Sequence, residues 1–138
     1  MICTSYNIRG LAGASKRRAL RNFLSKSETQ VLLIQDNMIL ASDAIDIFLH
    51  IKLHWRVSAI DAQGLFGGIL TTWNPTFGDF QAFHTFAGLL VEGYIRGFPD
   101  KIRILNIYGP CRDMPTFWDK VDRLNLLLLE NLIMGGGS

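Results

Sequence analysis

Short apolar segments that end at turn-forming residues fill most of the chain and leave room for only a few helices. Runs of this length, either alternating or continuous, are typical of β-strands. We expect strands at residues 1–6, 30–35, 54–60, 67–75, 78–86, 88–97 and 101–110. The first strand ends at Asn7, and the pair Gly67-Gly68 allows the chain to enter the fourth strand close to a neighbouring segment.

Three segments have apolar residues at helical spacing. The first, at residues 15–26, can be capped by Ser15. Its apolar stripe consists of Ala19, Leu20, Phe23 and Leu24. The second begins at Ser42-Asp43, and the third is predicted at residues 113–132.

The order of these elements predicts the fold class. Strands come first, two helices lie between the early strands, further strands follow, and one long helix comes last. This order favours a mixed α/β layered domain with antiparallel strand pairs over a regularly alternating βαβ fold. A chain of 138 residues, 49% apolar and 19% charged, has the size and composition of one globular domain.

The sequence lacks the features of a secreted or membrane-spanning protein. The first ten residues contain no apolar core of signal-peptide length, and the longest apolar runs, such as residues 126–129, are too short to cross a bilayer. Cys3 and Cys111 are expected to be free thiols. We therefore expect an intracellular protein, in the nucleus or the cytoplasm, with no membrane partner.

Positive charge is concentrated near the start of the chain, although the formal net charge is only +2. Residues 1–27 contain no acidic side chain. Their basic side chains are Arg9, Lys16, Arg17, Arg18, Arg21 and Lys26. Such a cluster attracts phosphate groups, but a charge run is also commonly the solvated face of a helix. Both interpretations stay open from charge alone.

Several enzyme classes find no support in the sequence. It contains no Gly-x-Ser-x-Gly nucleophile motif, no Walker motif and no dinucleotide-binding glycine pattern. His50 and His54 have the spacing of a metal pair on a helix, but no His-Glu-x-x-His motif frames them. We expect surface or packing histidines and no small-molecule cofactor.

Polar residues at strand ends are the remaining candidates for chemistry. Asn7 and Asp36 each follow a predicted strand, and Asn106 and Tyr108 lie near the end of another. Side chains that leave strand ends in layered α/β proteins gather at one rim. A carboxylate there can bind Mg²⁺, which prefers oxygen ligands. Taken one by one, Asn7 and Asp36 can equally be turn formers.

Five segments, in this order, carry a family resemblance: SYNIRGL, KRRALRNFLSKSETQVLLIQDN, GGILTTWNP, NIYGP and FWDK. Together they resemble the endonuclease domain of plant LINE-type (non-LTR) retrotransposons. That domain belongs to the endonuclease/exonuclease/phosphatase superfamily, which includes apurinic endonucleases and DNase I. The resemblance covers residues 1–136. It implies a four-layered, DNase I-like α/β sandwich and Mg²⁺-dependent cleavage of a DNA phosphodiester, which nicks target DNA for reverse transcription.

The resemblance also implies roles for individual residues. Asn7 matches an asparagine near the metal and the phosphate, and Tyr6 stands where the family usually has tryptophan. Asp36 falls at the position of a metal-binding glutamate, and Tyr108 matches a tyrosine that contacts the region of the scissile phosphate. Basic residues expected to contribute to DNA-backbone attraction are Arg9, Lys16, Arg17, Arg18 and Arg21.

Two departures from the family pattern change the functional expectation. The Asp36 carboxylate is shorter than that of glutamate by one C–C bond, about 1.5 Å, and Mg²⁺ requires near-ideal octahedral geometry. Gly137 stands where the family has an aspartate, and the later asparagine and Asp-His pair have no counterpart. We expect residues 1–136 to be the N-terminal part of the domain, an incomplete sandwich, and residues 137–138 to be a divergent or linker-like end.

The isolated chain is therefore expected to be inactive or weakly active. Two alternatives remain. One is a non-enzymatic retrotransposon-derived remnant with at most weak nucleic-acid binding. The other is a different phosphatase or phosphodiesterase of the same superfamily.

Overall fold

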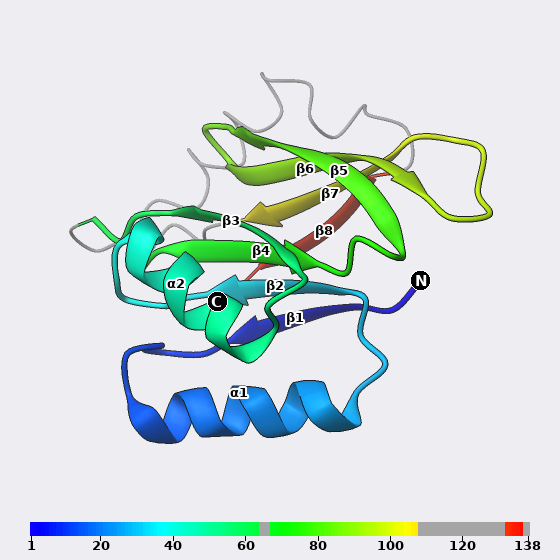
Figure 1. Ribbon diagram of the computed structural model, residues 1–138. Helices are drawn as coiled ribbons and strands as arrows, with labels where there is room; N and C mark the ends of the chain where they lie inside the picture. The colour runs from blue at the N-terminus through cyan, green and yellow to red at the C-terminus, as the bar shows by residue number, and fades with distance from the viewer. Residues whose placement is uncertain (64–66, 108–131, 137–138) are drawn as a thin grey trace.

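Two four-stranded sheets and two helices make up the computed structural model, which describes residues 1–63, 67–107 and 132–136 (Figure 1). The first sheet has the order β1-β2-β4-β3 and the second β5-β6-β7-β8. The strands of the first sheet are β1 (Cys3–Asn7), β2 (Val31–Gln35), β3 (Arg56–Ile60) and β4 (Ile69–Trp73). Those of the second are β5 (Gly78–His84), β6 (Gly88–Ile95), β7 (Ile102–Ile107) and β8 (Leu132–Gly136).

Both sheets are mixed. Strand β1 runs parallel to β2, and β4 pairs antiparallel with both β2 and β3. In the second sheet β5, β6 and β7 are antiparallel neighbours, whereas β8 runs parallel to β7. The predicted mixed α/β fold with antiparallel pairs is therefore confirmed.

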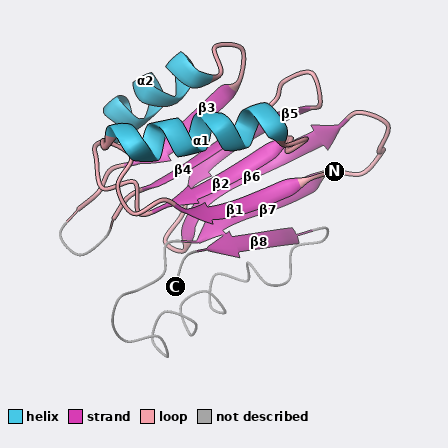
Figure 2. Ribbon diagram, turned by 90° about the horizontal axis from the view of Figure 1, so that it is seen from below, coloured by secondary structure: helices cyan, strands magenta, loops and turns pink. Residues whose placement is uncertain are grey.

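The two helices, α1 (Ala14–Lys26) and α2 (Ala41–Ile51), lie across the outer face of the first sheet (Figure 2). Leu20 and Leu24 of α1 and Phe48 of α2 are buried there. Of the stripe predicted for α1, Ala19 and Phe23 remain exposed. In the part of the chain that the structure describes, neither helix is long and apolar enough to cross a membrane.

The cap predicted for α1 is wrong, whereas α2 begins at Ala41, one residue before the expected start at Ser42-Asp43. Gly13 precedes α1 with extended backbone, its carbonyl accepts the Arg17 N–H, and Ser15 lies inside the helix. Leu40 occupies the cap position of α2, where the Asp61 carboxylate, twenty residues along the chain, accepts the Ala41 N–H at 2.6 Å. Asp61 thus accepts a hydrogen bond from a backbone N–H at the start of the helix, a role usually filled by the side chain of a local cap residue.

The predicted end of the third helix is also wrong. Leu132 begins strand β8, in which it pairs with Arg103 of β7. An apolar segment as short as that around Leu132 has no periodicity that separates strand from helix. Most of the segment 113–132, which was expected to supply a further helix layer, lies outside the described residues.

Strand β2 is buried on both faces because it lies between the two layers of the core. Leu32 and Ile34 contact the helix side, whereas Val31 and Leu33 face the second sheet. Between the sheets, Trp73 of β4 meets Phe80 of β5 edge to face, with ring centroids 5.7 Å apart. Successive residues of β2 face opposite layers because side chains alternate between the two faces of a strand.

The two sheets approach each other closely at Gly135 of β8. A Cβ atom on Gly135 would lie 2.7 Å from Leu33 Cδ1 and 3.2 Å from Ser5 Oγ. Any side chain larger than hydrogen would force the sheets apart at this point. Gly135 therefore brings β8 directly against β1 and β2.

Candidate active site

The loops that follow β1 and β2 run side by side at one rim of the first sheet. The parallel pairing continues beyond the strand ends, because Ile8 N–H donates to the Gln35 carbonyl at 3.1 Å and Gly10 N–H to the Asp36 carbonyl at 2.8 Å. Leu11 N–H donates to the Asn37 carbonyl, also at 2.8 Å. These bonds hold Asn7 and Asp36 next to each other at the carboxyl ends of two parallel strands.

The side chains of Asn7 and Asp36 are in direct contact. Asn7 Nδ2 donates a hydrogen bond to Asp36 Oδ2 at 2.8 Å. The other polar atom of the amide, Asn7 Oδ1, is buried and accepts no hydrogen bond from the described residues. A buried acceptor without a donor is costly, so this oxygen is available for a ligand that supplies positive charge or a proton.

The backbone at this rim is strained at three non-glycine residues. Arg9, Asp36 and Met38 have positive φ angles of 53°, 54° and 65°. Residues held in this region cost on the order of 1–3 kcal/mol each and persist where the surrounding structure fixes them. Asp36 is fixed by its carbonyl bond to Gly10 and by its carboxylate bond to Asn7.

The glycine pair before β4 lies against this loop, as the sequence predicts. A Cβ atom on Gly67 would be 2.5 Å from Asp36 Oδ1, and one on Gly68 would be 2.4 Å from Asn37 Oδ1. Gly68 also has φ +82°, which side chains rarely adopt. The two glycines therefore let the β3–β4 connection close the rim around the Asp36 carboxylate.

The donor atoms at the rim fit Mg²⁺ only in part. Asp36 supplies a carboxylate and Asn7 a buried amide oxygen, both hard donors. Mg²⁺ is commonly held by one or two carboxylates and keeps several waters. In the residues 1–63, 67–107 and 132–136, no three His, Cys, Asp or Glu side chains come together as a metal cluster. Asp36 and Asn7 would therefore be the protein ligands that this region provides.

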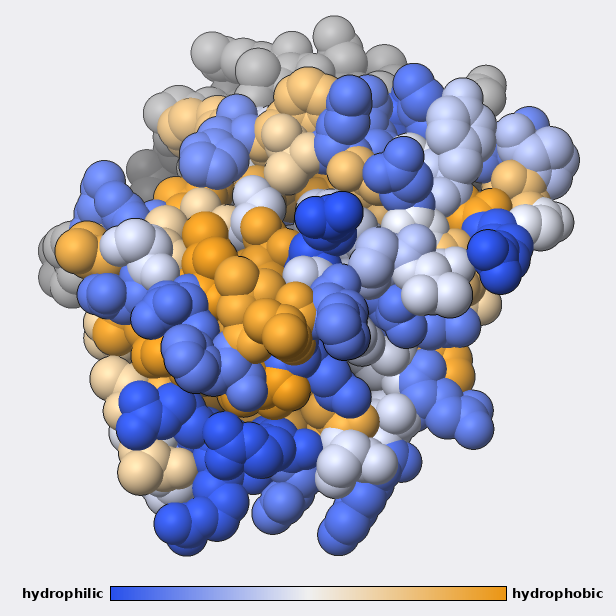
Figure 3. All heavy atoms as spheres, viewed as in Figure 1, coloured by the Kyte–Doolittle hydropathy of each residue, from blue (hydrophilic) through white to orange (hydrophobic). Residues whose placement is uncertain are grey.

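The other predicted site residues are placed as follows. Arg9 is exposed in the loop between β1 and α1, and Lys16, Arg18 and Arg21 are exposed on α1. Because α1 begins at this loop, its first turn is nearest the rim, and Arg21 lies about 7.5 Å further along the axis than Lys16. Hydrophilic surface covers α1 (Figure 3). Tyr108 lies outside the described residues.

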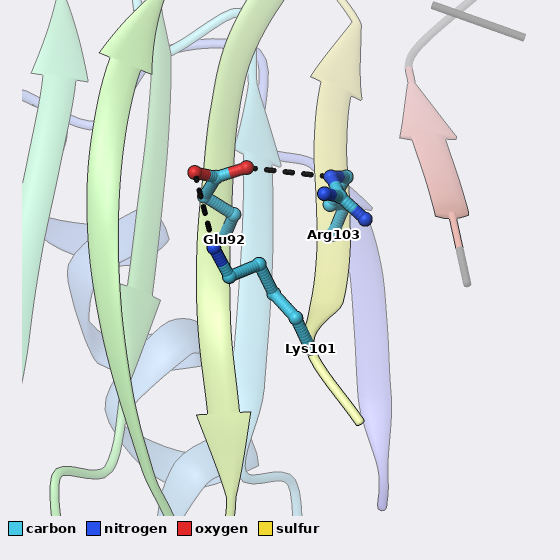
Figure 4. Close-up of polar contacts among 3 residues, drawn as sticks. All are labelled: Glu92, Lys101 and Arg103. Atoms are coloured by element: carbon cyan, nitrogen blue, oxygen red, sulfur yellow. Dashed lines mark ion pairs between the residues drawn. The ribbon is translucent and has the colours of Figure 1, made fainter. Parts of the chain in front are cut away.

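Charge on the second sheet is arranged differently from that on α1. Glu92 of β6 accepts Arg103 Nε at 3.3 Å and lies 4.0 Å from Lys101 Nζ (Figure 4). Both cations therefore lie beside a carboxylate. Among the described residues, no ion pair involves the basic side chains of α1. The basic side chains of α1 therefore form a positively charged surface that the carboxylates of the described ion pairs do not neutralise.

The histidines do not join the site. His50 Nδ1 lies 2.7 Å from the Asp46 carbonyl, one turn earlier in α2, and His54 is exposed after that helix. The expectation of surface histidines is met at both positions. His84 is exposed at the end of β5.

A buried polar network next to the rim was not predicted. Gln35 Nε2 donates to Ser5 Oγ and to Asn106 Oδ1, both at 3.0 Å. Asn106 Nδ2 in turn donates to the Leu70 carbonyl at 3.0 Å and to Thr71 Oγ1 at 3.2 Å. The signal in the sequence is an amide residue within each of two otherwise apolar strands, VLLIQ and ILNI.

Solved structures share this architecture. An AP endonuclease from Leishmania major, LMAP, matches 97% of the chain with a TM-score of 0.67 and 17% identity. An endonuclease/exonuclease/phosphatase family protein from Bacteroides thetaiotaomicron matches 97% with a TM-score of 0.66 and 10% identity. The endonuclease domain of TRAS1, a telomere-specific non-LTR retrotransposon, matches 97% with a TM-score of 0.63 and 15% identity.

The fold is that of the endonuclease/exonuclease/phosphatase proteins. The chain spans 54% of LMAP, 60% of the Bacteroides protein and 57% of the TRAS1 domain. No protein-family model and no curated protein sequence matches this chain. At such low sequence identity, the similarity to these structures establishes the fold of the chain. It does not establish the activity, because one fold can carry many functions.

Proposed function

We propose that this chain is the N-terminal part of a Mg²⁺-dependent DNA endonuclease of the LINE-type retrotransposon branch, with little or no activity in isolation. The observation that carries the proposal is the pair Asn7–Asp36 at the carboxyl ends of two parallel strands, where the buried Asn7 Oδ1 accepts no hydrogen bond from a described residue. The plant-type motifs in the sequence and the TRAS1 endonuclease domain among the structural neighbours support this branch.

Each residue of the pair has a definite task in this proposal. Asp36 would hold the metal through Oδ1, since Oδ2 already accepts the Asn7 amide. Asn7 would orient that carboxylate and present Oδ1 to the metal or to a water bound on it. Bound Mg²⁺ neutralises phosphate charge and stabilises the leaving oxygen. Tyr108 is proposed to contact the region of the scissile phosphate.

DNA would approach over the basic surface of α1. Arg9 in the β1–α1 loop and Lys16 in the first turn of α1 are both exposed, and both belong to the segment that follows Asn7. Arg17, Arg18 and Arg21 continue this surface along the helix. Contacts of this kind neutralise backbone phosphates without reading sequence.

Weak activity of the isolated chain is proposed because the described residues bring no group that could activate water to the Asn7–Asp36 pair. One carboxylate and one amide are the hard donors at the rim, and the exposed His50 contacts its own helix. A reaction of this class needs a base for water as well as a metal. A segment that follows residue 136 in the longer family members would supply it.

The test is nicking of supercoiled plasmid in Mg²⁺ and in EDTA. We would compare this chain, its Asp36→Asn variant and a version extended at the carboxyl end by the family's downstream segment. The expected result is Mg²⁺-dependent nicking by the extended version alone, abolished by Asp36→Asn. Nicking by the extended version that survives Asp36→Asn would contradict the assignment of the metal ligand.

A second candidate is a non-enzymatic nucleic-acid binder. It is favoured by the fact that no cluster of three metal-ligating side chains forms in the described ranges, while α1 keeps its unpaired basic surface. The same plasmid experiment separates the two, because the binder would retard DNA in a gel and produce no nick even when extended.

A further inference from the structure

Two amide side chains meet in the dry space between the sheets. Gln35 is 3% exposed and Asn106 is 0% exposed, and Gln35 Nε2 donates to Asn106 Oδ1 at 3.0 Å. The two residues are separated by 71 positions and belong to different sheets. This is a direct polar contact between the first sheet and the second.

The contact is satisfied on both sides. Gln35 Nε2 also reaches Ser5 Oγ in β1, while Asn106 Nδ2 is shared among Leu70 O, Thr71 Oγ1 and Ile34 O at 3.0, 3.2 and 3.3 Å. A buried amide that loses its partner costs far more than a well-paired one contributes. The network therefore tolerates only one offset of β7 relative to β2 and β4.

The surrounding contacts would not specify that offset. Beside the amides, the described residues between the sheets form an apolar cluster that includes Val31, Leu33, Val91 and Ile104. Apolar packing of this kind accepts shifts and substitutions, whereas hydrogen bonds require fixed positions. The amide pair is the element of this interface that fixes the relative placement of the two sheets.

The members of the network stand next to the proposed site residues in each strand. Ser5 lies two residues before Asn7, Gln35 immediately precedes Asp36, and Asn106 lies two residues before Tyr108 in the sequence. The bond from Gln35 to Ser5 links β2 to β1, the strand that bears Asn7. The bond from Gln35 to Asn106 links β2 to β7.

We infer that Gln35 and Asn106 are positioning residues that fix the Asn7–Asp36 pair relative to β7. The geometric part of this inference stands on the hydrogen bonds alone, and only its consequence for metal binding rests on the proposed function. Outer partners of metal ligands typically change metal affinity by about 10- to 100-fold when they are removed. We expect a change of that size on removal of the Asn106 amide.

The test uses the full chain, its Asn106→Leu variant and a matched control, Ile104→Ala. Ile104 is fully buried on the same strand and faces the same core, but it takes part in none of the side-chain hydrogen bonds of the network. The first readout is the NMR signal of the Asn7 side-chain NH₂, which donates to Asp36. The second is the affinity for Mn²⁺, used as the probe metal.

Asn106→Leu is expected to shift the Asn7 NH₂ signal and to weaken Mn²⁺ binding at least tenfold. Ile104→Ala is expected to lower the unfolding temperature about as much as Asn106→Leu does. Unlike Asn106→Leu, it is expected to leave the Asn7 signal unchanged. The inference is overturned if both variants lose stability and neither moves the Asn7 signal. If the unsubstituted chain binds no Mn²⁺, the proposed metal site fails, and the Asn7 signal still decides the positioning role.

A gentler variant covers the case in which Asn106→Leu does not fold. Thr71→Val removes one acceptor of Asn106 and keeps the shape of the side chain. Thr71 lies in β4 and is remote in sequence from Asn7. A smaller shift of the Asn7 signal in the same direction is expected, and an unchanged signal overturns the inference.

Discussion

Gly67 lies directly against the carboxylate of Asp36, so close that a Cβ atom on Gly67 would be 2.5 Å from Oδ1. The same Cβ would be 3.0 Å from Met38 Sδ. The absence of a side chain at position 67 is therefore a condition for the position of Asp36. Asp36 therefore lies between Gly67 and its hydrogen-bond partner Asn7 in the sense that it contacts both.

Substitution Gly67→Ala tests this relationship. We expect a loss of about 1–3 kcal/mol in the free energy of unfolding, because the added methyl group overpacks the rim. Mn²⁺ affinity should fall as well, since Asp36 must move. The matched control is Gly13→Ala, whose Cβ would lie at an ordinary 3.8 Å from Lys16 Cγ. The control should leave the free energy of unfolding within about 0.5 kcal/mol, and equal effects at both positions would contradict the prediction.

Replacement Asp36→Glu tests whether the short carboxylate limits metal binding. The extra C–C bond extends the reach of the carboxylate by about 1.5 Å, and misplacement of this size can cost about 10²-fold in rate. We expect Asp36→Glu to raise both Mn²⁺ affinity and the nicking rate of the extended version. The Asp36→Asn variant should lose both. A lower affinity for Asp36→Glu than for the unsubstituted chain would show that Gly67 leaves no room for the longer side chain.

Charge reversal of Arg17 and Arg18 tests the basic surface of α1. We expect weaker binding to duplex DNA and a smaller slope of log K against log salt, by about 0.9 for each phosphate contact that is lost. Arg56→Glu serves as the control, because Arg56 is exposed on β3, at the edge of the first sheet opposite β1. If the double reversal leaves the slope unchanged, or if Arg56→Glu lowers it as much, DNA does not bind along α1.

Titration of Cys3 gives a pH dependence of stability. Burial raises the pKa of the Cys3 thiol above its ordinary value. The neutral thiol is therefore favoured in the folded state, so its contribution to stability is complete below the unfolded-state pKa and is lost as pH rises through the folded-state pKa. Alkaline denaturation of a Cys111→Ser background should begin at lower pH than that of the same background carrying Cys3→Ala. Coincident curves would contradict the prediction.

The sequence predicts the strands well because their information is local. The run VLLIQ is predominantly apolar and forms β2, whose five residues are all buried. Asn7 and Asp36 were each expected at the end of a strand, and their side chains are in contact there. The position of Asp36 at the rim could be predicted for the same reason. It follows a strand whose direction and register set where the carboxylate must lie.

What the sequence does not reveal depends on partners that are distant in the chain. The Ala41 N–H at the start of α2 donates to Asp61, in the connection after β3, and the residues around the helix start give no sign of this partner. The contact between Gln35 and Asn106 spans 71 positions, and each amide alone is also consistent with a strand end. Only the packing of one sheet on the other brings these two side chains together.

The position of Gly135 against Ser5 and Leu33 also governs the order in which the molecule can fold. Strand β1, which begins at Cys3, gains its contacts with β8 only when β8, which begins at Leu132, is in place. Contacts of such wide separation in sequence carry a large loop-closure entropy and form late. On the ribosome, β1 and β2 can pair early, yet the face of β2 that carries Leu33 lacks its contact with Gly135 until β8 has left the exit tunnel. During that interval the exposed strand faces are a target for chaperones and for aggregation.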